Sequence, residues 1–68
     1  MYKLYSMRNG KIENRGEFPT LEEAEKHMKL LIDAQSRVKS WYIRKHQKGR
    51  HIYYDYGAHN AKYIVEVE

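Results

Sequence analysis

The sequence lacks cysteine altogether, and it contains one proline, one tryptophan and one phenylalanine in 68 residues. Without cysteine the chain can form no disulfide, no redox-active thiol pair and no thiolate zinc site, which are the devices that stabilise many small secreted scaffolds. A chain of this kind suits a reducing compartment, and we therefore expect a cytoplasmic protein.

Long apolar runs are absent as well. No uncharged apolar run exceeds three residues, as at Leu30–Ile32, whereas a membrane helix needs about 20. Met1 is followed by no signal-peptide pattern. We expect no membrane contact.

The sequence also has few features that support catalysis. Its glycines are isolated, so no glycine-rich loop is available to hold a phosphate group. No serine lies in a nucleophile motif, and Thr20 is expected to cap a helix. Glu66 and Glu68 fit a solvated strand edge. The sequence predicts no catalytic residue, no enzyme activity and no cofactor.

The four histidines raise the question of a metal site. The hairpin predicted below would place His46 opposite His51, but no third ligand lies beside them. Asp55 would be two cross-strand steps away, and Arg44 between them would repel a cation. Because structural zinc and copper sites need three or four ligands, we expect no metal site.

The remaining composition is that of a small folded domain. Hydrophobic residues make up 41% of the chain and charged residues 32%, which is enough apolar surface for a thin core. No repeat, linker or low-complexity segment divides the sequence. We expect residues 1–68 to form one domain.

One amphipathic helix is predicted in the middle of the chain. Thr20-Leu21-Glu22-Glu23 is a capping box, in which the Thr20 hydroxyl accepts from the Glu23 amide. Apolar residues follow at three- and four-residue spacing, and the helix should end near Gln35 or Ser36. Its apolar stripe consists of Leu21, Ala24, Met28, Leu31 and Ile32.

A hairpin is predicted before this helix, because Asn9-Gly10 is the preferred pair for a type I′ turn. The strands would be Tyr2–Met7 and Lys11–Phe18, with Met7 opposite Ile12. In this register Phe18 shares a face with Tyr5 and Met7, and the pattern does not decide which face is the core.

After the helix, the sequence predicts three more strands. Residues 40–47 and 50–56 would pair across Lys48-Gly49, with Arg44 opposite Tyr53, and residues 62–68 alternate as a final strand. The inward side chains would be Trp41, Ile43, Lys45, Ile52, Tyr54, Tyr56, Tyr63, Val65 and Val67. The predicted fold is α+β, in the order β-β-α-β-β-β, with about five antiparallel strands and the helix packed on one face.

The positive charge is concentrated in one segment. Residues 36–51 contain six basic residues and no acid, whereas the formal net charge of the whole chain is only +4. Such a block attracts polyanions or an acidic protein face. The candidate binding residues on the outward face of the second hairpin are Tyr42, Arg44, His46, Lys48, Arg50, His51 and Tyr53.

Several readings of these residues stay open. Aromatic rings interleaved with cations on an open sheet are a common means of binding single-stranded nucleic acid, with little sequence specificity. The same side chains also suit an ordinary solvated sheet face. The alternative function is a protein-interaction module, either a homodimer or an inhibitor or accessory protein of a phage or mobile element. Seven tyrosines favour it, because tyrosine is a frequent interface anchor.

The junction between the second strand and the helix resembles a known family. Gly16-Glu17-Phe18-Pro19-Thr20-Leu21-Glu22-Glu23-Ala24 is similar to the G-x-F-x-T-x-x-E-A helix start of the AP2-like amino-terminal DNA-binding domains of tyrosine integrases. The resemblance covers Lys11 to Leu31 and implies contact with nucleic acid. Those domains have three strands before the helix, whereas two are predicted here.

Overall fold

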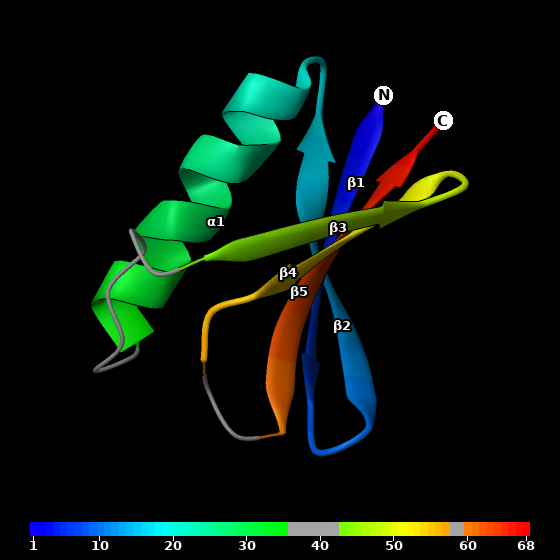
Figure 1. Ribbon diagram of the computed structural model, residues 1–68. Coiled ribbons are helices and arrows are strands. Elements are labelled where there is room, and N and C mark those ends of the chain that lie inside the picture. The colour runs from blue at the N-terminus through cyan, green and yellow to red at the C-terminus, as the bar shows by residue number, and fades with distance from the viewer. Residues whose placement is uncertain (36–42, 58–59) are drawn as a thin grey trace.

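The computed structural model describes residues 1–35, 43–57 and 60–68 of the chain. Five strands form one sheet in the order β2-β1-β5-β4-β3, with every pairing antiparallel. Helix α1 lies along one face of this sheet (Figure 1). The predicted α+β fold and its element order are confirmed. The elements are β1 (Tyr2–Arg8), β2 (Lys11–Phe18), α1 (Leu21–Gln35), β3 (Arg44–Lys48), β4 (His51–Asp55) and β5 (Ala61–Val67).

The first and last strands of the sequence are neighbours in the sheet. Leu4 of β1 lies opposite Val65 of β5, and the Glu68 amide donates to the Met1 carbonyl at 2.9 Å. The two chain ends therefore lie side by side (Figure 1). This pairing joins the β1–β2 hairpin to the β3–β4 hairpin through β5.

The core lies between α1 and one face of the sheet. Ala24, Met28 and Ile32 form a single row along α1, at four-residue spacing, and each is at most 1% exposed. Their apolar side chains contact the sheet through the buried residues Leu4, Ile52, Tyr54, Tyr56, Tyr63 and Val65. The inward positions predicted for β4 and for the middle of β5 are thus the buried ones.

Helix α1 begins where the capping pattern predicts. The Glu23 amide donates to the Thr20 hydroxyl oxygen at 3.1 Å, and the Ala24 amide donates to the Thr20 carbonyl at 3.2 Å. The first bond satisfies one of the amides at the helix start that have no partner within the helix, and the second is the first backbone bond of the helix itself.

In the first hairpin the turn is as predicted, but the predicted face of Phe18 is wrong. Asn9 and Gly10 have φ angles of 52° and 80°, as a type I′ turn requires, and Met7 lies opposite Ile12. Phe18, however, is on the core face with Leu4 and not with Met7. The register shifts between Leu4 and Tyr5, and such a bulge reverses the face of every later residue.

The residues at this bulge are held by specific bonds. The Arg15 Nε donates to the Ser6 hydroxyl at 2.9 Å, and the Gly16 amide donates to the Asn14 side-chain oxygen at 2.7 Å. Gly16 has a φ of 134°, which residues with a side chain rarely adopt. The bulge allows Phe18 to pack against the core.

In the second hairpin the predicted register is wrong by two residues. Arg44 lies opposite Asp55, and Tyr53 lies opposite His46. The two central residues of the turn are Gly49 and Arg50, and Gly49 has a φ of 61°. A type II′ turn needs this conformation at its first central position, which favours glycine there and so sets the register. A shift of two keeps each side chain on its face. Trp41 and Tyr42, predicted in this strand, lie outside the described residues.

A polar contact ties both strands of this hairpin to the helix. The Tyr54 hydroxyl donates to the Glu25 carboxylate at 2.6 Å, and the Lys45 ammonium lies 2.9 Å from the same oxygen. Lys45 and Tyr54 are cross-strand neighbours. Burial, followed by the bond to Glu25, raises the pKa of the Tyr54 phenol, so that this hydroxyl stays a donor.

We expect Tyr54→Phe to lower the free energy of unfolding by about 1–2 kcal/mol, because the substitution removes the hydroxyl donor of the partly buried Glu25 carboxylate and leaves it only the Lys45 ammonium. Urea denaturation followed by circular dichroism measures the change. Tyr53→Phe, on the opposite face of β4, is the matched control and should shift stability by less than about 0.5 kcal/mol. Equal effects of the two substitutions would contradict the role assigned to this bond.

The same contact predicts a dependence of stability on pH. Burial alone would raise the pKa of Glu25, but the Tyr54 hydrogen bond and the Lys45 ammonium together lower it below the ordinary value of 4.5. A lowered pKa in the folded state stabilises the fold above the ordinary value, and this contribution is lost as the pH falls through the lowered pKa. Glu25→Gln lacks the titrating group.

We therefore expect the stability difference between wild type and Glu25→Gln to be constant from pH 7 to about 5 and to shrink between pH 5 and 3. Urea denaturation of both proteins at each pH gives the difference directly. A difference that stays unchanged down to pH 3 would show that the Glu25 charge does not stabilise the fold.

Candidate nucleic-acid interface

The sheet face away from α1 is called the open face here. It is built from the residues that alternate with those on the helix side of each strand, three from every strand. They are Lys3, Tyr5, Met7, Ile12, Asn14, Glu17, Arg44, His46, Lys48, His51, Tyr53, Asp55, Lys62, Ile64 and Glu66.

An apolar row crosses the middle of the open face. Ile64 of β5 lies between Tyr5 of β1 and Tyr53 of β4 in the cross-strand register. Ile64 is only 9% exposed although it faces away from the core, and both tyrosines are half-buried. The row ends at His46 on the edge strand β3. The centre of the open face is thus apolar and aromatic.

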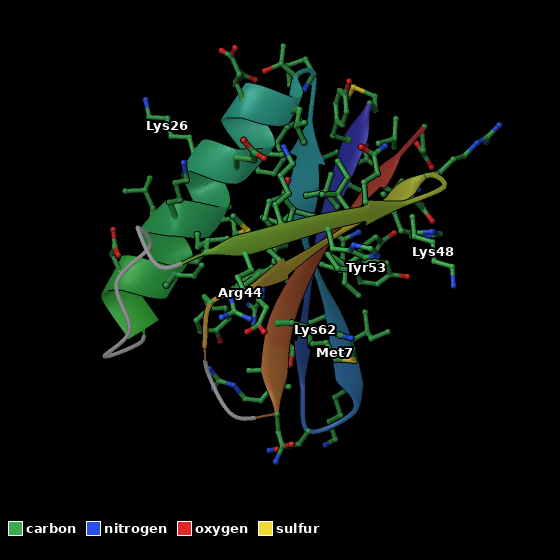
Figure 2. All side chains as sticks on the ribbon, in the orientation of Figure 1. Met7, Lys26, Arg44, Lys48, Tyr53 and Lys62 are labelled. Carbon is green, nitrogen blue, oxygen red and sulfur yellow. The ribbon has the colours of Figure 1, made fainter. Side chains whose placement is uncertain are left out.

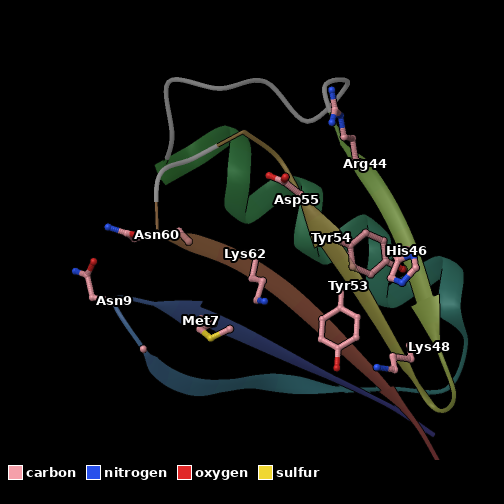
Figure 3. A pocket seen from close by; sticks show the side chains of 12 residues that line it. Met7, Asn9, Arg44, His46, Lys48, Tyr53, Tyr54, Asp55, Asn60 and Lys62 are labelled. Carbon is pink, nitrogen blue, oxygen red and sulfur yellow. The ribbon is translucent and has the colours of Figure 1, made fainter.

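A shallow concavity runs over the open face beside this row (Figure 3). Side chains of four strands line it, from Met7 on β1 to the outward residues of β3. Its far end is formed by Asn9 and Asn60, which belong to two adjacent turns joined by a bond of 2.9 Å from the Asn9 amide to the Asn60 carbonyl. The cationic and aromatic residues that line it are Arg44, His46, Lys48, Tyr53, Tyr54 and Lys62, and the acid Asp55 lies among them.

The ring of Tyr53 is the centre of this arrangement. The Lys62 ammonium lies 5.4 Å from the ring centroid, and the His51 ring lies 6.3 Å away on the other side. Figure 2 shows Tyr53 and Lys62 together on the open face, with Lys48 close to them and Lys26 on the distant outer side of α1. A planar group that stacks on Tyr53 would therefore meet positive charge beside it.

The charges of the open face are divided between its two halves. On the β1 side Lys3 lies 2.8 Å from Glu68 and 3.8 Å from Glu17. On the β3 side, among the residues that the structure describes, Arg44 and Lys48 have no ion-pair partner. Among the described residues, the open-face cations without an ion-pair partner are therefore Arg44 and Lys48 at the β3 edge and Lys62 on β5, with the acid Asp55 opposite Arg44.

Four of the predicted site residues are brought together, namely Arg44, His46, Lys48 and Tyr53. His51 is on the same face but contacts the Glu66 carboxylate at 3.3 Å, and Arg50 lies in the turn. Tyr42 lies outside the described residues. The predicted pairings of Arg44 with Tyr53 and of His46 with His51 are wrong, because the register differs by two.

The sequence analysis missed three residues of this surface: Lys62, Tyr5 and Ile64. The alternation along the last strand already places Lys62 and Ile64 on one face. Their closeness to Tyr53, however, follows from the pairing of β4 with β5, and that of Tyr5 from the pairing of β1 with β5. No local pattern in the sequence specifies which strands pair.

The two edge strands are poorly suited to pairing with another strand. All five residues of β3 are exposed, and three of them are cationic, while β2 carries the bulge next to Asn14. Charged side chains and bulges are the usual protection against edge-to-edge association. A partner is therefore more readily accommodated on the open face than at an edge.

Residues 1–35, 43–57 and 60–68 contain no cluster of three or more His, Asp or Glu side chains able to hold a metal ion. Across the same ranges, no helix is both long and apolar enough to span a membrane.

The chain was compared with known protein families, curated proteins and solved structures. No family model, no curated protein and no solved structure matches this chain.

Proposed function

We propose that the protein is a small, non-catalytic module that binds single-stranded nucleic acid on its open face, with little sequence specificity. The observation that carries this proposal is the half-buried Tyr53 ring on the open face, which has the Lys62 ammonium 5.4 Å from its centroid. Arg44 and Lys48 are nearby on β3, both exposed. Rings that stack with bases, together with cations that neutralise phosphates, are the means by which open sheets bind single strands.

The electrostatics of the surface support the same ligand. Of the three acids of the open face, Glu17 is engaged with Lys3 and Glu66 contacts His51. A polyanion on the β3 side would therefore meet one carboxylate beside the cations, that of Asp55 opposite Arg44. An unstacked single strand is favoured over a duplex, because a ring can stack only with a base whose face is free.

The proposal predicts binding of oligothymidylate that weakens steeply as salt increases. If three cationic side chains of the open face each neutralise one phosphate, the slope of log affinity against log salt should be about −2, from about −0.7 per phosphate. Fluorescence anisotropy with a labelled dT8 at several salt concentrations measures it. Absence of binding to dT8 at the lowest salt would refute the proposed function.

A substitution at the ring tests the stacking contact. Tyr53→Ala should weaken dT8 binding about tenfold, since stacking of one base contributes about 1–3 kcal/mol, whereas Tyr53→Phe should keep most of the affinity. Circular dichroism checks that both variants are folded. An affinity of Tyr53→Ala equal to that of wild type would show that this ring is not a stacking platform.

A protein partner is the second candidate, and a different part of the open face favours it. Ile12 is 60% exposed and lies opposite the half-buried Met7, so the β1–β2 turn end of the open face carries an apolar pair. Adjacent apolar side chains of this kind are common in protein interfaces. Light scattering distinguishes the two: Ile12→Ser should convert a dimer into a monomer if a second copy binds there, and should leave dT8 binding unchanged.

A further inference from the structure

Three side chains of β3 form a regular row along the rim of the open face. Arg44, His46 and Lys48 are alternate residues of the strand, so they point to the same side, and all three are exposed. Alternate residues of an antiparallel strand are about 6.8 Å apart. The residues between them face the other way, and Lys45 is held there by Glu25 at 2.9 Å.

This spacing suits the backbone of a nucleic acid. In an extended single strand, successive phosphates are separated by about the same distance as alternate residues of a β-strand. One phosphate can therefore meet each of Arg44, His46 and Lys48 in turn. Arginine and lysine carry a permanent positive charge, and even a neutral imidazole offers one N–H donor. Because β3 is the last strand of the sheet, its rim leaves the phosphates in water.

The apolar row fixes where the bases would lie. From His46, the cross-strand neighbours lead inward to Tyr53, then to Ile64, and then to Tyr5. The reverse placement is disfavoured, since the β2 side of the open face presents Ile12 and Asn14 opposite Met7 and Tyr5. Phosphates fit the rim of β3, and bases fit the centre of the sheet.

We propose that a single strand runs along β3, with consecutive phosphates on Arg44, His46 and Lys48 and with its bases turned inward onto Tyr53 and toward Tyr5. This inference rests on the proposed function. It adds the path of the strand along β3, the orientation of its bases toward the centre of the sheet, and a footprint of three to four nucleotides. Figure 3 shows the three side chains following β3, with Tyr53 on their inner side.

One acidic residue lies beside the path and provides a sharp test. Asp55 is the cross-strand neighbour of Arg44, and its Oδ1 accepts from the Gly57 amide at 2.8 Å. Its charge opposes a phosphate on Arg44. Asp55→Asn removes the charge and keeps a side-chain oxygen for the Gly57 amide, so that the turn should remain intact.

The experiment measures dT8 affinity against salt concentration for wild type and five variants. Lys48→Gln should make the slope shallower by about 0.7, the value for one lost phosphate contact. Lys26→Gln on the outer side of α1 removes an equal charge and should leave the slope unchanged. Asp55→Asn should tighten binding several-fold at low salt, whereas Glu22→Gln, an exposed acid of α1, should change affinity less than twofold. A gain in affinity cannot arise from misfolding.

The fifth variant tests whether a base contacts Tyr5, and a series of oligonucleotide lengths tests how many nucleotides the site covers. Tyr5→Leu should weaken dT8 binding several-fold without changing the salt slope, because it removes a base contact and no phosphate contact. Affinity should rise steeply from dT2 to dT4 and only modestly from dT4 to dT8.

The outcomes separate this inference from the proposed function. Binding that depends on Tyr53 but shows the wild-type slope in Lys48→Gln, or no gain in Asp55→Asn, would overturn the path along β3 and leave the proposed function standing. No binding by wild type would overturn both.

Discussion

A single 15-residue helix can cover only one face of a five-stranded sheet, and the arrangement of the molecule follows from this. Side chains alternate between the faces of every strand. Each strand therefore presents one set of residues to the side of the sheet that α1 covers and one set to the open face. In β4, Ile52 and Tyr54 are buried under the helix while Tyr53 between them faces outward. Two tyrosines adjacent in sequence thus have different environments.

Within the described residues no segment covers the open face, which must keep its shape through its own contacts. Cross-strand contacts do this: Tyr5, Ile64 and Tyr53 pack in one row, and Ile64 at its centre is 9% exposed. Lys3 is held by Glu17 and Glu68. Arg44 and Lys48, which have no ion-pair partner among the described residues, give the β3 edge a positive potential.

The edge strand that carries this charge is itself held in place from the other face. Lys45 of β3 and Tyr54 of β4 both contact the Glu25 carboxylate of α1. Because side chains of β3 alternate, the contact on the helix side positions Arg44 and His46 on the open face. Stability and the candidate site are therefore coupled through one short strand, whose five residues are all exposed and none of which is apolar.

What the sequence by itself determined is local. The Thr20 cap, the Asn9-Gly10 turn, the helix over Leu21–Gln35 and the alternation within each strand follow from backbone and side-chain preferences over a few residues. These preferences were sufficient for the element order and for the outward facing of Arg44, His46 and Tyr53.

The tertiary structure decided which strands pair and in which register. The bulge beside Arg15 moved Phe18 to the core, and the Gly49-Arg50 turn shifted the second hairpin by two residues. The pairing of β5 with both β1 and β4 brought Lys62, Ile64 and Tyr5 to Tyr53. Such pairings depend on how the whole apolar surface is buried at once, and no short segment of the sequence contains that information.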